Sequence, residues 1–292
     1  MKTTGIKLLG VALMGTSLTL GACSGKKSAS ADSAAAATAS PYVSTDTVHW
    51  ADSLSLSGCN ADVKINGQYP SEGTQPLLDS VRSWLGKCLT MNMWNADKPV
   101  FTPTAEQFAS GNAMAEACGK ALIASARTDF EGFARDSITT NYEYIYNFGS
   151  SFSSDSVVTY FFTGYGYLGG AHGGTVANAQ SFDTNSGVQL TAANMFRADA
   201  RGALVEKLRS GLWEQYFKPE AGEGMTLRDM LLINPDTLPL PQFPPVFLEK
   251  GIAFTYQQYE IAPYAAGMPQ CLFPYTEMKP LMTQEAARLI PE

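Results

Sequence analysis

The spacing of apolar and polar positions divides the chain into strand-like and helix-like segments. Residues 142–148 alternate strictly, with aromatic side chains at every second position, and residues 157–167 form a second β-rich run. A third run of the same type covers residues 176–182. The pattern predicts a strand over residues 142–148 that pairs with the strand over residues 157–167.

Helical periodicity is clearest where apolar residues recur with a period of 3.6. These positions are Leu77, Leu78, Val81, Trp84, Leu85, Cys88 and Leu89. A second helix is expected from about Thr104 to Arg135, because Thr104 and Gln107 have the spacing of a capping box. Glycines inside this second helix, namely Gly111, Gly119 and Gly132, are expected to weaken and bend it.

The remaining pattern predicts hairpins and shorter helices. A hairpin is expected over residues 47–69, and a closing hairpin joins residues 246–248 to residues 252–259. Helices are expected over residues 199–217 and 226–232, and a last strand over residues 270–273. The fold class that follows is α+β, with antiparallel sheets and helices packed on them in two lobes. We expect an N-terminal lobe over residues 47–150 and a C-terminal domain over residues 151–292.

Composition limits the function classes. The 292 residues are 45% apolar and carry a formal net charge of −7. The length allows one or two domains with substantial cores. The acidic balance and the lack of a basic stripe argue against a nucleic-acid partner.

The N-terminus predicts export. Lys2 and Lys7 precede a short apolar run over residues 8–20, which is typical of a secretory signal. The following Leu20-Gly21-Ala22-Cys23 resembles the lipobox of bacterial lipoproteins. This predicts a signal peptide over residues 1–22 and a lipid on Cys23, with an ordinary buried N-terminal helix as the alternative. The Ser- and Ala-rich residues 23–46 are expected to be a flexible tether.

Anchoring through Cys23 predicts a bacterial envelope location. No acidic run follows Cys23, since residues 24–27 read Ser-Gly-Lys-Lys, so a periplasm-facing orientation is favoured over the cell surface. The abundance of Ala, Gly, Tyr and Ser is typical of a Bacteroidota lipoprotein.

The other cysteines leave two alternatives open. Their even number in an oxidising compartment permits two disulfides, whereas some of them are buried free thiols in the alternative, since free cysteine is among the most buried side chains. They are Cys59, Cys88, Cys118 and Cys271. Their spacing fits no metal-binding pattern, and His49 and His172 have no partner nearby in sequence. We therefore expect neither a metal nor a cofactor.

A glycine-rich loop around His172 is the most distinctive segment. Its glycines allow backbone conformations closed to other residues and a close approach by a ligand or another chain. They are Gly169, Gly170, Gly173 and Gly174. Gly164, Gly166 and Gly169 also spell a dinucleotide-binding pattern, but a strand rather than a helix follows them. The nucleotide interpretation is therefore rejected.

His172 has a structural and a catalytic interpretation. As a histidine fixed among glycines it fits a general base, but it equally fits a hydrogen-bonding group that ties the loop to a neighbour. The second interpretation is favoured, and no catalytic residue is assigned. Tyr165 and Tyr167 beside the loop suit stacking on sugar rings or anchoring a protein partner, although strand tyrosines usually pack in a core.

Three segments together resemble a bacterial envelope family. They are YLGGAHGG at residues 167–174, SFDTNSGVQLTAANMF at residues 181–196 and YEIAPYAAG at residues 259–267. They are similar to domain-of-unknown-function family 3298, the RsiV-like C-terminal domain, and INGQYP at residues 65–70 is similar to the family 4163 domain that precedes it.

The resemblance implies a binding module of the cell envelope. Relatives include an anti-sigma factor that binds lysozyme and a peptidoglycan deacetylase that carries the module beside its catalytic domain. The expected partner is a peptidoglycan glycan or a lysozyme-like protein, with membrane contact through the lipid anchor only. The alternative is an envelope hydrolase that uses His172 as general base.

The two irregular loops are expected to meet. We expect the strands before Tyr167 and Tyr259 to be neighbours in one antiparallel sheet. The Glu260 carboxylate would then accept from His172 or from backbone N–H groups of the glycine loop, and the Tyr264 hydroxyl would hold the same loop. The binding residues predicted in this way are Tyr165, Tyr167, Gly169, Gly170, His172, Gly173, Glu260 and Tyr264.

Overall fold

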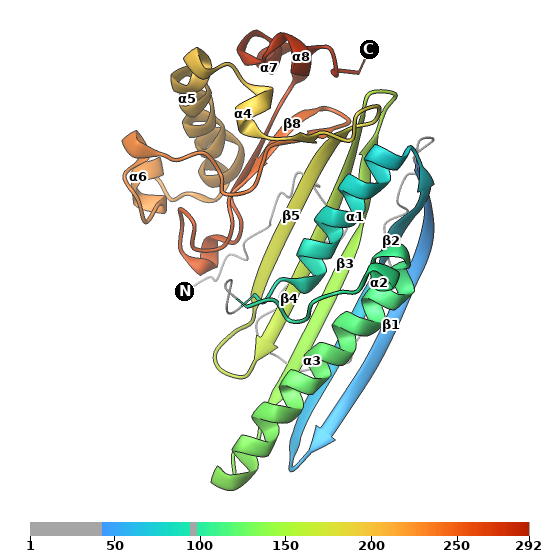
Figure 1. Ribbon diagram of the computed structural model, residues 1–292. Coiled ribbons are helices and arrows are strands. Elements are labelled where there is room, and N and C mark those ends of the chain that lie inside the picture. The colour runs from blue at the N-terminus through green and yellow to red at the C-terminus, as the bar shows by residue number, and fades with distance from the viewer. Residues whose placement is uncertain (1–42, 94–97, 292) are drawn as a thin grey trace.

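A computed structural model describes residues 43–93 and 98–291, which form two β-sheets and the helices that cover them (Figure 1). The larger sheet has six strands in the order β1-β2-β3-β4-β5-β6. Its strands are β1 Val43–Leu56, β2 Cys59–Gly73, β3 Asn141–Ser153, β4 Val157–Leu168, β5 Gly174–Asp183 and β6 Gln189–Leu190. The smaller sheet consists of β7 Val246–Leu248, β8 Gly251–Thr255 and β9 Gln270–Phe273. The predicted α+β fold class is confirmed.

The helices fall into an N-terminal group and a C-terminal group. The N-terminal group is α1 Gln75–Thr90, α2 Ala105–Ala109 and α3 Gly111–Phe133. The C-terminal group is α4 Ala192–Met195, α5 Arg201–Gly211, α6 Leu227–Met230, α7 Tyr275–Met278 and α8 Gln284–Ala287, with the π-helical segment η3 Leu212–Phe217 following α5. Among the described residues, no helix has both the length and the apolar character needed to cross a membrane.

The helix expected from Thr104 to Arg135 is divided into two helices, α2 and α3. The capping box at Thr104 and Gln107 is confirmed, but the helix it starts ends at Ala109. Ser110 then adopts an extended conformation, and its hydroxyl accepts from the Ala113 N–H to cap α3. Two capping residues six positions apart therefore give two helices, and the single helix over residues 104–135 is wrong.

The larger sheet is not wholly antiparallel. β2 and β3 pair in parallel, in a register that joins Asn60 to Asn141 and Gly67 to Phe148, whereas the other neighbours in this sheet are antiparallel. A parallel pair needs a long crossover connection, and the segment with α1, α2 and α3 supplies it. The expectation of purely antiparallel sheets is corrected at this one pair.

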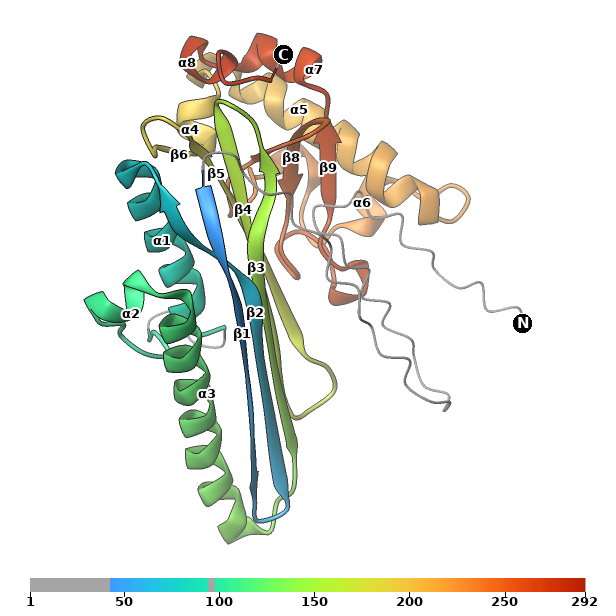
Figure 2. The same ribbon diagram turned by 90° about the vertical axis from the view of Figure 1, so that its right-hand side faces the viewer.

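The main core lies between the larger sheet and its helices. Figure 2 shows α1 and α3 on one face of this sheet, with β8 and β9 on the other. The residues of β2 alternate between buried and exposed, so Ala61, Val63 and Ile65 enter the core while Asn60 and Lys64 face away from the helices. This alternation gives the sheet a covered face and an open face.

Glycines of α3 bring this helix close to the sheet. A Cβ atom at Gly119 would lie 1.9 Å from the nearest ring atom of Trp50 in β1, and one at Gly111 would lie 2.4 Å from Tyr69 in β2. Gly132, at the end of the helix, has no such neighbour within 4 Å. The first two glycines are therefore required for packing.

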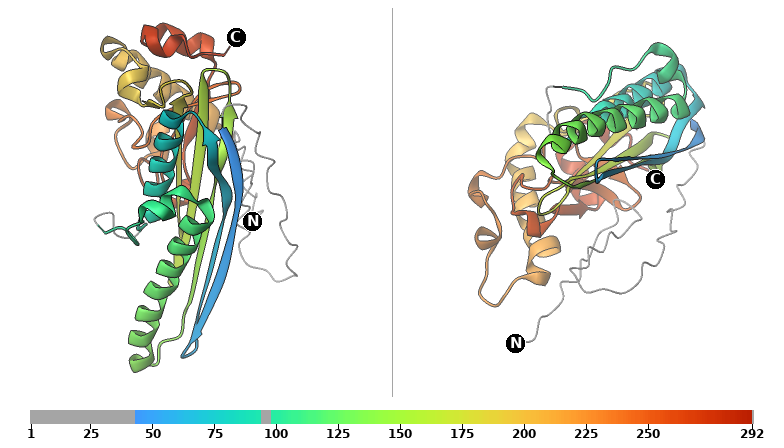
Figure 3. Two further views of the ribbon diagram at one scale, coloured as in Figure 1. Left: turned by 45° about the vertical axis from the view of Figure 1, so that its right-hand side comes forward. Right: turned by 90° about the horizontal axis from the view of Figure 1, so that it is seen from below.

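The two sheets are joined by apolar and polar contacts. Ala179 in β5 packs with Val246, Leu248 and Ala253 of the smaller sheet. Beside them, the buried Thr159 hydroxyl donates to the Phe247 carbonyl at 2.7 Å. The second sheet thus lies against one end of the open face, and no other helix or strand of the described residues covers the rest of that face (Figure 3).

Two predicted boundaries fall inside strands. Residue 46, the expected end of the tether, lies within β1, which begins at Val43, so the folded part begins earlier than expected. The division between residues 150 and 151 lies within β3. The division into two domains stays a prediction, and so do the signal peptide and the lipid on Cys23, which lie outside the described residues.

The described cysteines are free thiols. They are Cys59, Cys88, Cys118 and Cys271, and each is buried. Burial raises the pKa of the thiols of Cys88, Cys118 and Cys271 well above the usual range. Of the two alternatives left open by the sequence, the structure has the buried thiols and not the disulfides.

Candidate functional site

The glycine loop joins β4 to β5 and has an unusual backbone. Gly169 and Gly170 have φ angles of +80° and +100°, which residues with a Cβ atom rarely adopt. A Cβ atom at Gly169 would also lie 2.5 Å from the Thr140 hydroxyl. The Tyr167 hydroxyl donates to the Gly170 carbonyl at 3.0 Å, so the strand before the loop also holds its shape.

His172 and Tyr264 bring the two predicted loops together. Their rings stack with centroids 3.9 Å apart and an interplanar angle of 21°. The buried Gly173 carbonyl accepts from the Tyr264 hydroxyl at 3.1 Å, and His172 Nδ1 lies 2.9 Å from the same oxygen. The expectation that the loops meet, and that Tyr264 holds the glycine loop, is confirmed.

The route by which the loops meet differs from the prediction. β4 belongs to the larger sheet and β8 to the smaller one, and β8 ends at Thr255 rather than at Tyr259. The expectation of neighbouring strands in one sheet is therefore wrong. Two glutamines make the connection instead.

These glutamines replace a missing strand neighbour along β5. Gln257 Oε1 accepts from the Ala177 N–H at 3.0 Å, and its Nε2 donates to the Ala177 carbonyl at 2.9 Å. Gln258 Oε1 accepts from the Thr175 N–H at 2.9 Å. The side chains thus satisfy backbone groups that a β-strand would otherwise pair. Only the adjacent pair of amide side chains at the end of a strand-like run pointed to them in the sequence.

Glu260 stabilises its own loop rather than the glycine loop. Its carboxylate accepts from the backbone N–H groups of Gln242 and Gln257, both at 2.7 Å. The prediction that this carboxylate accepts from His172 or from the backbone of the glycine loop is wrong. His172 is exposed, and its partner, the buried Gly173 carbonyl, also accepts from the Tyr264 hydroxyl.

Tyr259 was missed by the sequence analysis. It is 57% exposed, and its φ angle of +64° is exceptional for a bulky residue. Its ring centroid lies 5.8 Å from that of Tyr264. Strained backbone of this kind concentrates at functional sites. A sequence carries no direct signal for it.

Tyr165, in β4, is a further aromatic residue that packs against the glycine loop. It is half-buried, and its ring packs so closely on Gly173 that a Cβ atom there would lie 2.5 Å from it. Burial, followed by the nearby Glu143 carboxylate, raises the pKa of Tyr165. Its hydroxyl therefore remains a hydrogen-bond donor at neutral pH. We call Tyr165, Tyr167, His172, Tyr259 and Tyr264 the aromatic surface.

The aromatic surface adjoins the open face of the larger sheet. Tyr165 pairs in register with Ile145, and Tyr167 with Glu143, so these side chains share one face. Farther along this face, Asn60 Nδ2 donates to Asn141 Oδ1 at 3.1 Å. Polar side chains thus continue from the tyrosines across three strands.

The described contacts of His172 are one polar contact and one ring contact. His172 contacts a backbone carbonyl and a phenol ring. Within the described ranges, no three His, Cys, Asp or Glu side chains gather to hold a metal ion.

Comparison with known proteins gives a family for part of the chain. Residues 193–276 match the family model described as "Protein of unknown function (DUF3298)". No curated protein matches the chain.

Two solved structures share the fold. A DUF3298 family member from Bacteroides fragilis superposes with a TM-score of 0.65 at 20% identity, covering 83% of this chain and 94% of that one. A DUF3298 family protein from Pseudomonas aeruginosa gives a TM-score of 0.55 at 15% identity, covering 86% of this chain and 97% of that one. The chain therefore contains a DUF3298 domain at residues 193–276 and has the fold of solved DUF3298 family proteins.

Proposed function

We propose that the protein is a lipid-anchored module of the bacterial envelope whose aromatic surface binds a glycan such as that of peptidoglycan. The observation that carries the proposal is Tyr259, which is 57% exposed at a φ angle of +64° beside the stacked rings of His172 and Tyr264. An exposed aromatic ring in a strained conformation costs stability, and a ligand that stacks on the ring offsets that cost.

The open face supports a long polar ligand rather than a small apolar one. Beyond the tyrosines it presents hydroxyl, amide and imidazole groups, among them Ser55, whose hydroxyl donates to Asn60 at 2.8 Å, and His49, whose Nδ1 lies 2.6 Å from Asn66 Oδ1. These groups are exposed or half-buried. They can exchange hydrogen bonds with sugar hydroxyl and acetamido groups along a chain.

The anchor rests on the sequence. The Leu20-Gly21-Ala22-Cys23 segment supports acylation of Cys23, and the residues that follow support a periplasm-facing orientation. Acyl chains bury methylene groups at about 0.8 kcal/mol each. Cys23→Ala should therefore leave the protein unprocessed or free of the membrane, as fractionation would reveal. A variant that still partitions fully with membranes would contradict the anchor.

A lysozyme-like protein is the second candidate partner. It is supported by the resemblance of the two loops to the RsiV-like domain and by the exposed Tyr259, because tyrosine is a frequent anchor in protein interfaces. A hydrolase that uses His172 is less well supported, because the described contacts of His172 orient it against a carbonyl and a ring rather than beside a carboxylate.

A binding experiment separates these functions. The full chain would be incubated with purified peptidoglycan, soluble muropeptides and lysozyme, and bound protein and released sugar would both be measured. We expect saturable binding to the glycan without turnover, weakened by Tyr259→Ala and by Tyr264→Ala. Val188→Ala, a change at a 51% exposed residue of the β5–β6 hairpin, is the control and should bind normally. Binding to lysozyme alone would favour the second candidate, and hydrolysis lost in His172→Ala would favour the enzyme.

A further inference from the structure

The C-terminal helices border a shallow, open pocket that is separate from the aromatic surface. It has a volume of about 450 Å³ and lies between α5, η3, α6 and the 3₁₀ turn η5 Pro235–Thr237. The volume is within the range of small-molecule sites. Arg209, Trp213, Arg228 and Asp236 are among its lining residues.

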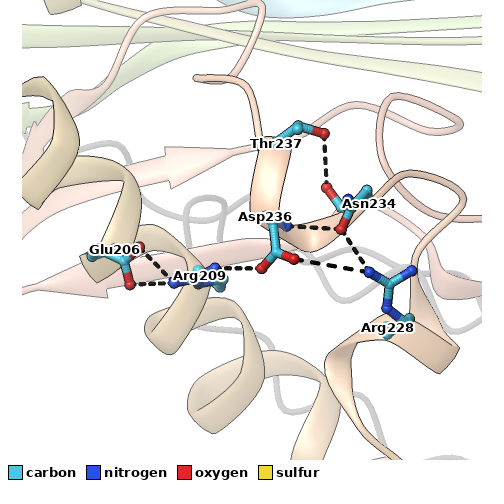
Figure 4. Close-up of polar contacts among 6 residues, drawn as sticks. All are labelled: Glu206, Arg209, Arg228, Asn234, Asp236 and Thr237. Carbon is cyan, nitrogen blue, oxygen red and sulfur yellow. Dashed lines mark hydrogen bonds and ion pairs between the residues drawn. The ribbon is translucent and has the colours of Figure 1, made fainter.

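Four charged side chains follow one another along this pocket, and the Asn234 amide beside it ends the series (Figure 4). Arg209 Nη2 bonds to the Glu206 carboxylate, and its Nη1 donates to Asp236 Oδ1 at 2.8 Å. Arg228 Nη2 donates to Asn234 Oδ1 at 2.9 Å and lies 3.9 Å from Asp236 Oδ2. Acceptors and donors therefore alternate along the series: Glu206, Asp236 and Asn234 accept, and Arg209 and Arg228 donate. The formal charges of the two arginines and two carboxylates cancel.

This alternation of positive and negative groups disfavours a charged ligand of either sign. An anion at either guanidinium would also face the Asp236 carboxylate, and a cation at either carboxylate would face a guanidinium. A hydroxyl group donates and accepts at once, so a row of hydroxyls can bond to both kinds of group. Arg228 keeps spare capacity for such bonds, because only Nη2 of its guanidinium has a hydrogen bond within the described residues, and its side chain is 64% exposed. The pocket thus complements a neutral polyhydroxyl compound.

Trp213 supplies an apolar wall for the same ligand. It is half-buried, and it lies one turn after Arg209 in the π-helical segment η3. Short π-helical insertions occur often at functional sites, where they redirect a side chain. A flat indole beside alternating donors and acceptors matches a sugar ring, which has an apolar face of C–H groups and a rim of hydroxyls.

We propose that this pocket is a second binding site of the protein, specific for a neutral saccharide of one or two rings. The Trp213 indole contacts the ring face, while Arg228 and Asp236 exchange hydrogen bonds with its hydroxyls. The proposal does not depend on the function of the aromatic surface, since the two sites share no residue.

Fluorine NMR of the full chain labelled with 5-fluorotryptophan tests this site. The chain would be kept in a detergent without a sugar headgroup, and the Trp213 signal would be assigned by its loss in Trp213→Phe. N-acetylglucosamine, galactose and mannose would be titrated separately, with acetate and ethylammonium as charged probes. We expect at least one sugar, and neither ion, to shift the Trp213 signal saturably.

Matched variants test whether the change in the Trp213 signal depends on the polar side chains of the pocket. Arg228→Ala and Asp236→Asn should each raise the dissociation constant about tenfold or more, as expected for losing a hydrogen bond to a charged group. Glu214→Gln, next to Trp213 in sequence but outside the pocket lining, should bind normally. Tyr264→Ala should also bind normally, which separates this result from a failure of the aromatic surface.

Three outcomes would overturn the proposal. They are the absence of a saturable shift with all three sugars, a larger response to acetate or ethylammonium than to the sugars, and unchanged sugar affinity in both Arg228→Ala and Asp236→Asn. The two polar variants also keep the test valid if substitution of Trp213 disturbs folding.

Discussion

The imidazole of His172 lies flat against the ring of Tyr264, with 3.9 Å between the ring centroids. The two residues come from loops that follow strands of different sheets, and both direct a polar atom to the Gly173 carbonyl. This one oxygen therefore connects the ends of the two sheets. It orders a glycine-rich segment whose backbone is entropically costly to fix.

Tyr264→Phe removes the hydroxyl but keeps the ring that stacks on His172. It therefore measures what the hydrogen bond to Gly173 contributes to stability. It should lower the free energy of unfolding by about 0.5–1.5 kcal/mol, the usual contribution of one hydrogen bond. The Gly173 carbonyl keeps its contact with His172, so the effect should stay within this range. Urea denaturation would measure it. A loss as large as that of Tyr264→Ala would show that the hydroxyl, and not the ring, orders the loop.

His172→Ala should have a similarly modest effect. Its removal costs one hydrogen bond and one ring contact of an exposed side chain, about 1 kcal/mol together. The buried Gly173 carbonyl stays paired, because it still accepts from the Tyr264 hydroxyl. Circular dichroism during urea denaturation would give the value. A loss of several kcal/mol would require a buried role for the imidazole.

Two glycines of α3 form a matched pair for a packing test. Gly119→Ala should destabilise by about 1–3 kcal/mol, because its Cβ atom would overlap Trp50 and force the helix away from β1. Gly132→Ala meets nothing within 4 Å and should stabilise by about 0.5–1 kcal/mol through helix propensity. Thermal unfolding of both variants would show opposite shifts. Equal shifts would mean that propensity alone governs this helix.

Local patterns predicted the elements well. The alternating residues of β3 and β4, the apolar face of α1 and the capping box at Thr104 each depend on neighbours a few residues apart, and each is confirmed. The division of the second helix was missed because both Thr104 and Ser110 can cap a helix. Periodicity cannot decide between one capped helix and two.

Long-range relationships were predicted only in part. The meeting of the two loops was expected from strands that are neighbours in one sheet, so the contact is confirmed but the expected route is wrong. The parallel pairing of β2 with β3 depends on a crossover that no local pattern encodes. Tyr259 and Gln257 were missed for the same reason. Their roles exist only once β5 and the loop after β8 lie side by side.

The thiols give a test that is independent of the site. Burial raises the thiol pKa values of Cys88, Cys118 and Cys271, so the reactive thiolate is scarce at neutral pH. In a Cys23→Ser background, the native protein should not react with Ellman's reagent. After unfolding without reductant, all four remaining thiols should react. Recovery of only two would indicate a disulfide.

Gln257 offers the sharpest test of how the two sheets are connected. Gln257→Leu keeps the approximate size of the side chain but leaves the Ala177 N–H and carbonyl without their partner. Because Gln257 is only 9% exposed, water replaces these bonds poorly, and we expect a loss of about 1–3 kcal/mol. Hydrogen exchange at the Ala177 amide should accelerate together with this loss.

Two control variants show whether that result is specific to the hydrogen bonds between Gln257 and Ala177 of β5. Gln258→Leu removes the single bond to the Thr175 N–H and should cost less than Gln257→Leu. Gln242→Leu changes an exposed amide and should be nearly neutral. If Gln257→Leu left both the unfolding free energy and Ala177 exchange unchanged, the glutamine would not substitute for a strand at the edge of β5. The aromatic surface, which depends on that loop, would then need another support.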